Sequence, residues 1–156
     1  MTAFVDMSKN YSFYSLPIAY FLALLPGVYS KSQASGTYDL ASPRSYQEAV
    51  QKDEKLDKMT KNRIMRAEAA TANGQETLSI FMLSVVAANV SGVPASTINT
   101  LCATYLGSRV VYNAVYIWLQ ENRKFAPLRS LVWNVSMISW MTLLVKAGNR
   151  VFAASS

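Results

Sequence analysis

Long apolar segments alternate with short polar ones along this chain. The first apolar segment, residues 12–30, contains no charged residue. As a helix rising about 1.5 Å per residue it is about as long as the ~30 Å hydrocarbon core of a bilayer. The full pattern predicts helices at about 12–30, 62–91, 96–119 and 129–148. We therefore expect an all-α fold: an integral membrane, four-helix up-down bundle formed by one domain over residues 1–156.

The first apolar segment has a second interpretation, a cleaved signal peptide. Lys9 precedes the segment, and Ser32-Gln33-Ala34 has the small-residue character of a cleavage site. We favour a retained membrane helix.

Residues 31–61 form a polar connection between the first two membrane helices. Ser42-Pro43 is a typical helix start, and residues 44–61 mix both charge signs at helical spacing. The pattern indicates a solvated helix inside a cytosolic loop.

The distribution of lysine and arginine predicts the orientation of the bundle. The segment 31–66 carries eight of them and the link before the fourth helix three more: Lys31, Arg44, Lys52, Lys55, Lys58, Lys61, Arg63, Arg66, Arg123, Lys124 and Arg129. The other side has only Lys9, Lys146 and Arg150. The positive-inside rule then puts both basic connections in the cytosol and both termini outside or in the lumen. For a eukaryotic cell we expect the endoplasmic reticulum or another internal membrane.

Composition excludes several kinds of chemistry. The chain has no histidine and one cysteine, Cys102, so an intrachain disulfide or a Ser-His-Asp system is impossible and a metal site is not expected. The net charge of +6 comes largely from the basic connections, and no nucleic-acid partner is needed to explain it.

Two stripes of polar residues lie inside the predicted membrane helices. Arg66, Asn73 and Glu76 stand at i, i+7 and i+10, on one face of the second helix. They can form a structural network between helices or hold a polar ligand.

The third helix carries the second stripe, Arg109, Tyr112 and Tyr116, at i, i+3 and i+7. An arginine deep in an apolar helix needs a partner, and an ion pair between Arg109 and Glu76 is one candidate. A structural pair and a ligand site can coexist.

Arg129 stands at the start of the fourth helix, next to Ser130. It is either an ordinary positive-inside arginine or a cation aimed at an anionic ligand or a thiolate. Trp133, Trp140, Tyr105 and Tyr116 include candidates for interfacial anchors. Together the polar groups predict an anion-accepting pocket at the cytosolic end of the bundle, with apolar and aromatic walls.

These stretches resemble the MAPEG family, the membrane-associated proteins of eicosanoid and glutathione metabolism. RAEAATANGQETLSIF from Arg66 is similar to the family's second-helix signature, YLGSRVVYNAVY around Arg109 to its third, and APLRS around Arg129 to the start of its fourth. The resemblance covers about residues 60–147 and favours a bacterial or fungal type of member.

The resemblance implies a homotrimer with sites between subunits. It implies that glutathione is the cofactor, held by Arg66, Asn73, Glu76, Arg109, Tyr112 and Tyr116. It also implies catalytic roles for Arg129, Ser130 and Tyr116, with Arg129 stabilising the glutathione thiolate and Ser130 donating a hydrogen bond to the same sulfur. A nearby guanidinium lowers the pKa of a thiol, which is about 8.5 when free. A lipophilic substrate and membrane lipid complete the expected partners.

The sequence departs from the synthases of this family at three places. Ala69 and Ala72 stand where those enzymes carry further arginines, and Lys31 is the nearest cation where they have an arginine at the end of the first helix. The link between Tyr116 and Arg129 is also longer, so Arg123 or Lys124 is an alternative to Arg129.

Three functions are therefore compatible with the sequence. The first is a glutathione-dependent transferase or isomerase acting on a lipophilic substrate. The second is a glutathione-independent membrane isomerase or cyclase of lipophilic metabolite biosynthesis. The third is a non-enzymatic binding or regulatory protein on the same scaffold.

Overall fold

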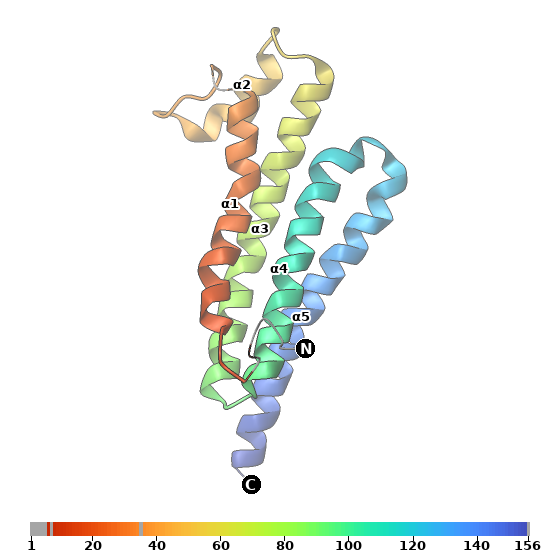
Figure 1. Cartoon of the computed structure of the whole chain (residues 1–156). Coiled ribbons are helices and arrows are strands. Elements are labelled where there is room, and N and C mark those ends of the chain that lie inside the picture. The colour runs from red at the N-terminus through yellow and green to blue at the C-terminus, as the bar shows by residue number, and fades with distance from the viewer. Residues whose placement is uncertain (1–5, 7, 35, 156) are drawn as a thin grey trace.

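Four long antiparallel helices form the body of the molecule (Figure 1). The computed structural model describes residues 6, 8–34 and 36–155. The long helices are α1 (Ser15–Gln33), α3 (Lys58–Val90), α4 (Ala95–Trp118) and α5 (Ala126–Ala154). Shorter elements connect or precede them: η1 (Ser12–Tyr14), η2 (Pro43–Ser45), α2 (Tyr46–Lys52), η3 (Leu119–Glu121) and η4 (Arg123–Phe125). The predicted all-α architecture is confirmed.

Two helices begin earlier than the apolar pattern indicates. The Asp57 carboxylate accepts hydrogen bonds from the backbone N–H groups of Met59 and Thr60, and this cap starts α3 at Lys58 rather than at residue 62. Helix α5 starts at Ala126 rather than at residue 129, with a proline in its first turn, where a missing N–H costs nothing. It also continues past residue 148 to Ala154.

The expected continuous helix over residues 44–61 is wrong. Helix α2 ends at Lys52 because Asp53 adopts an extended backbone, and its carboxylate accepts hydrogen bonds from Thr37 Oγ1 and Lys55 N. Nor is α2 solvated all round. Tyr46 and Val50 are buried with Ile64, and the Tyr46 hydroxyl donates to the Ser30 carbonyl over 2.7 Å. The connection is therefore docked on α1 and α3.

The turn between α3 and α4 is tight and needs a glycine. Gly92 has φ +74°, which side chains disfavour, and Val93 N and Gly92 N donate to the carbonyls of Ala88 and Asn89. We call this end of the bundle, with residues 91–94 and the C-terminal turns of α5, the turn end. The opposite end, with α2 and the link 119–125, is the loop end (Figure 1). Both basic connections lie at the loop end.

Small and aromatic residues hold the helices together. Gly74 of α3 lies against Ala23 of α1, and a Cβ at Gly74 would be 3.0 Å from both Ala23 Cα and Ala23 Cβ. Between α3 and α4 the rings of Phe81 and Tyr105 stack with centroids 3.7 Å apart and planes within 5°. Tyr105 is 2% exposed, so it is a core residue and not an interfacial anchor.

Two stretches of the described chain are long and apolar enough by themselves to cross a membrane, Ser12–Gln33 and Arg123–Ala154. Helix α3 carries more charged side chains than the other long helices, Arg66 and Glu76 among them. Helix α4 carries Arg109, and α5 carries Arg129, Lys146 and Arg150. The charged residues of the long helices are thus concentrated on α3.

Gly74 provides a test of the α1–α3 packing. We expect Gly74→Val to lower the unfolding free energy by about 1–3 kcal/mol, because the new side chain would overlap the backbone of Ala23. Thermal unfolding of the purified protein in detergent measures the change. The matched control is Gly107→Val, since nothing lies within 4 Å of a Cβ built at Gly107. Equal losses at the two positions would contradict the packing argument.

Candidate functional site

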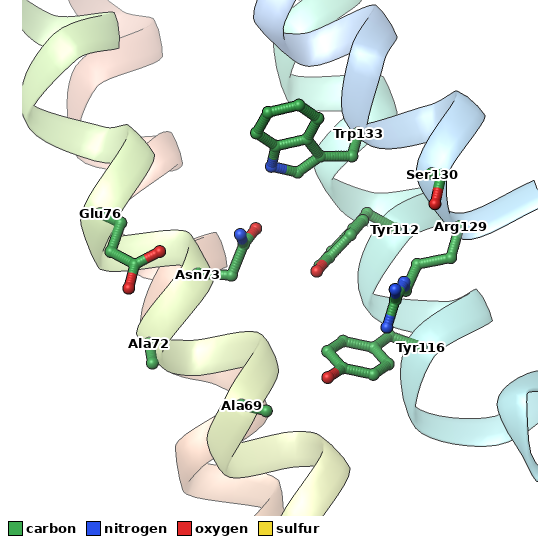
Figure 2. A pocket seen from close by; sticks show the side chains of 9 residues that line it. All are labelled: Ala69, Ala72, Asn73, Glu76, Tyr112, Tyr116, Arg129, Ser130 and Trp133. Atoms are coloured by element: carbon green, nitrogen blue, oxygen red, sulfur yellow. The ribbon is translucent and has the colours of Figure 1, made fainter. Parts of the chain in front are cut away.

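A polar cavity opens in the loop-end half of the bundle, where α3 and α5 diverge in front of α4. Its volume is about 420 Å³, within the range of small-molecule sites. Three helices line it, and Figure 2 shows the side chains facing one another across it: Ala69, Ala72, Asn73, Glu76, Tyr112, Tyr116, Arg129, Ser130 and Trp133.

One wall of the cavity is aromatic and cationic. Tyr112 and Tyr116 are one helical turn apart on α4, and their rings meet edge to face with centroids 5.6 Å apart. The Arg129 guanidinium of α5 lies over the Tyr116 ring, with Cζ 4.8 Å from its centroid. In the described part of the chain Arg129 has no carboxylate partner, so its charge faces the cavity uncompensated. A cation over an aromatic face is held in place without being neutralised.

Helix α3 provides the facing wall. Asn73 and Glu76 project from it into the cavity, and Ala69 and Ala72 leave open space beside them (Figure 2). Glu76 is exposed and has no hydrogen-bond or ion-pair partner among the described residues. The cavity of one chain therefore contains one free cation and one free carboxylate.

Arg109 does not line the cavity but supports it from behind. It is 4% exposed, and its Nη1 donates to Asn73 Oδ1 over 2.9 Å while Cζ lies 4.5 Å from the Tyr112 centroid. The candidate ion pair between Arg109 and Glu76 is not formed among the described residues. The guanidinium instead reaches Asn73, which leaves Glu76 open to the cavity.

Arg66 is also missing from the cavity wall. Its Nε donates to the Ile117 carbonyl over 3.1 Å, and its Nη2 lies 3.0 Å from Glu121 Oε1. Arg63 contacts the same carboxylate oxygen at 3.0 Å. The short helix η3 folds back over the end of α4 and brings Glu121 to these two arginines. In the single chain Arg66 is thus engaged outside the cavity, and its role as a glutathione ligand stays a prediction.

Among the other predicted cations, some line the cavity and some do not. Arg123 and Lys124 are exposed in η4 and do not line the cavity, whereas Arg129 does. Lys31 also lies elsewhere, because its Nζ is 3.7 Å from Glu68 Oε1 on another face of α3. Ser130 lines the cavity beside Arg129, with its hydroxyl donating to the Ala126 carbonyl over 3.3 Å.

Two residues that shape the site were not predicted from the sequence. Trp133 lines the cavity rather than only marking a membrane boundary, and its spacing of four residues from Arg129 on one helix was the available signal. Glu121 had a weaker signal, a lone carboxylate in a basic link. Its partners on α3 are distant in sequence.

The fold and the cavity together are those of an α-helical bundle with a polar, aromatic pocket at one end. The MAPEG family model matches residues 11–149, and the chain belongs to this family. It is therefore a membrane protein of the eicosanoid and glutathione metabolism family, whose members are mostly glutathione transferase-type enzymes. No curated protein and no solved structure matches the chain.

The ion pairs of Glu121 with Arg63 and Arg66 predict that stability depends on pH. Hydrogen bonding from Arg63, reinforced by the charges of both arginines, holds the pKa of the Glu121 carboxyl below its usual value. A depressed pKa in the folded state means that this stabilisation is complete above the unfolded pKa of about 4.3 and is lost as the pH falls through the folded value. We expect Glu121→Gln to lower Tm at pH 7, with the difference from the unmodified protein disappearing in acid.

The measurement is Tm between neutral and acid pH in one detergent. Glu54→Gln is the control, since Glu54 is exposed and has no ion-pair partner in the described part of the chain. A Tm difference for Glu121→Gln that persists unchanged in acid would contradict a stabilising role of these ion pairs.

Proposed function

We propose that this protein is a glutathione-dependent membrane transferase or isomerase acting on a lipophilic substrate, assembled as a homotrimer. The observation that carries the proposal is Arg129, a cation that has no carboxylate partner among the residues described and that faces Glu76 and Asn73 across the cavity. The MAPEG family consists mostly of glutathione transferase-type enzymes, which fits a thiolate as the anion at Arg129.

The chemistry would begin with the thiol. A guanidinium close to the sulfur favours the thiolate, so more nucleophile is present at neutral pH. Ser130, the next residue on α5, can donate a hydrogen bond to the same sulfur, and Tyr116 keeps Arg129 in place beneath it. The sulfur then donates an electron pair to an electrophilic carbon of the substrate. A C–S bond forms, and the displaced pair leaves with the leaving group or takes a proton from water.

The rest of glutathione would be held by the polar wall. Its ammonium group fits Glu76, and its amides fit Asn73 and the Tyr112 hydroxyl. Its two carboxylates have few partners in a single chain, because Arg66 and Arg109 are engaged outside the cavity.

In a homotrimer, a second subunit can supply the missing partners for the glutathione carboxylates. Ala69, Ala72, Glu76 and Ser130 are all exposed in the single chain, so the cavity is open on one side. In the proposed assembly a neighbouring subunit covers that side, excludes water and contributes further polar groups. We also propose that the loop end faces the cytosol and that both termini are lumenal, since the basic connections share the loop end.

A second function is favoured by the same shortage of cations. A glutathione-independent isomerase or cyclase would use Glu76, Tyr112 and Tyr116 as polar groups acting directly on a lipophilic substrate. Undiminished turnover of that substrate in glutathione-free buffer would replace the first proposal with this one.

The role of Arg129 can be tested through the pH dependence of the thiol. We expect Arg129→Gln to leave glutathione bound but to lower the thiolate fraction at pH 7 by about tenfold or more, because each unit of thiol pKa below 8.5 is worth a factor of ten. Ultraviolet absorbance of the bound thiolate against pH measures the fraction directly. Arg123→Gln, which removes a cation outside the cavity, is expected to change nothing. Identical titration curves for Arg129→Gln and the unmodified protein would exclude thiolate stabilisation by Arg129.

Binding of glutathione is the direct test of the proposed function. Isothermal titration of the purified protein should detect binding, and Ala72→Arg should tighten it by about tenfold, because a charged hydrogen bond to a carboxylate is worth ~1.5–3 kcal/mol. Ala72→Gln adds a shorter polar side chain that can donate hydrogen bonds but carries no charge, and it should gain much less. The absence of any binding to the unmodified protein at millimolar glutathione would exclude the proposal.

A further inference from the structure

Two adjoining cavities lie at the turn end of the bundle, opposite the candidate site. The first has a volume of about 290 Å³ and is lined by Val93, Pro94, Thr97, Lys146, Asn149 and Arg150. The second, of about 320 Å³, lies along α4 and α5 and is lined by Ser96, Thr97, Thr100, Leu101, Thr142 and Lys146. They share Thr97 and Lys146, so together they form one groove, which we call the turn-end groove.

The first cavity has an unbalanced positive charge. Lys146 and Arg150 are one helical turn apart on α5, and both are exposed. Within the described residues neither has a hydrogen-bond or ion-pair partner, and no acidic residue lines either cavity. Asp6, the acidic residue of the N-terminal segment, accepts hydrogen bonds from Ser8. Two like charges at this spacing disfavour each other unless an anion lies between them.

Neutral polar groups surround the two cations. The side chains of Asn149 and Thr97 can both donate hydrogen bonds to an anion. The N-terminus of α4 begins at Ala95 without a side-chain cap, and its positive dipole end lies beside the same cavity. These donors match the oxygens of a phosphate ester.

The position of the groove relative to the bilayer fits a membrane lipid. Along α5 the distance from Arg129 to Lys146 is about 26 Å at ~1.5 Å per residue, close to the ~30 Å hydrocarbon thickness. With Arg129 at one boundary of the bilayer, Lys146 reaches the other boundary. The second cavity then continues from Lys146 toward the interior of the membrane along Leu101 and Thr142.

We propose that the turn-end groove binds an anionic phospholipid. Its phosphate lies between Lys146 and Arg150, and one acyl chain follows the second cavity between α4 and α5. The alternative is that the two cations serve only the negative end of the α5 dipole and remain hydrated. The lipid site does not depend on the glutathione proposal, since none of its residues lines the candidate site.

Native mass spectrometry of the full chain, reconstituted with phosphatidylcholine and phosphatidic acid in equal amounts, tests the site. The unmodified protein should retain phosphatidic acid about tenfold more than phosphatidylcholine, since each basic side chain near an anionic headgroup increases the affinity for that lipid. The double variant K146Q/R150Q should lose this preference. The matched control R123Q/K124Q removes the same charge from the loop end and should keep it. An unchanged preference in K146Q/R150Q, or its equal loss in the control, would overturn the proposal.

Two further arms complete the test. Thr142→Trp fills the second cavity without changing any charge. Reduced retention of phosphatidic acid in this variant supports the acyl-chain position, and full retention refutes it. Inorganic phosphate serves as the headgroup alone. Its failure to displace the lipid at millimolar concentration supports a lipid site, whereas complete displacement shows a phosphate site without a lipid.

Discussion

The guanidinium of Arg109 is buried between α3 and α4, and much of the loop-end half of the bundle depends on how that charge is accommodated. A buried cation without a partner is costly in an apolar environment. Here it receives one hydrogen-bond acceptor, Asn73 Oδ1, and one aromatic face, Tyr112. These contacts fix the position of Asn73 on one wall of the cavity and of Tyr112 on the other. The spacing between α3 and α4 is therefore set by a polar contact as well as by apolar packing.

Which charged groups of the cavity lack a partner therefore depends on contacts that form outside the cavity. Arg109 is compensated by neutral groups, which leaves Glu76 without an ion-pair partner in the described ranges of the chain. Arg63 and Arg66 are both occupied by Glu121, which leaves Arg129 as the free cation of the cavity among the described residues. A cavity with one positive and one negative group suits a zwitterionic ligand better than a strongly anionic one.

The two ends of the bundle differ in how they are closed. At the loop end, α2 packs on the long helices, η3 brings Glu121 to Arg63, and Glu68 of α3 pairs with Lys31 of α1. At the turn end, Asn89 bonds to the side chains of Asn10 and Ser12, and the Asn99 amide donates to the Lys9 carbonyl. These contacts hold the N-terminal segment, while Lys146 and Arg150 stay exposed. The protein thus has a polar cavity in the loop-end half of the bundle and an open basic groove at the turn end.

The helical class, the four long helices and most of the cavity wall were predictable from the sequence alone. Apolar length and helical spacing are local properties, so the sequence places Asn73 and Glu76 on one face of the second helix and Tyr112 and Tyr116 on one face of the third. It also places Arg129 and Ser130 at the start of the fourth helix. The family, too, followed from local motifs and was confirmed. Helix starts were less accurate, because the cap at Asp57 and the early start of α5 at Ala126 depend on single side chains and turns.

Only the tertiary structure decided which of two equivalent arginines faces the cavity. Arg66 and Arg129 both looked like ligand-binding cations, but the fold of the link 119–125 brings Glu121 to Arg66 and leaves Arg129 free. The same holds for the partner of Arg109, for the burial of Tyr105 against Phe81 and for Trp133 in the cavity wall. Each of these contacts joins residues on different helices, and the relative rotation of packed helices is set by all their side chains together, which no local pattern encodes.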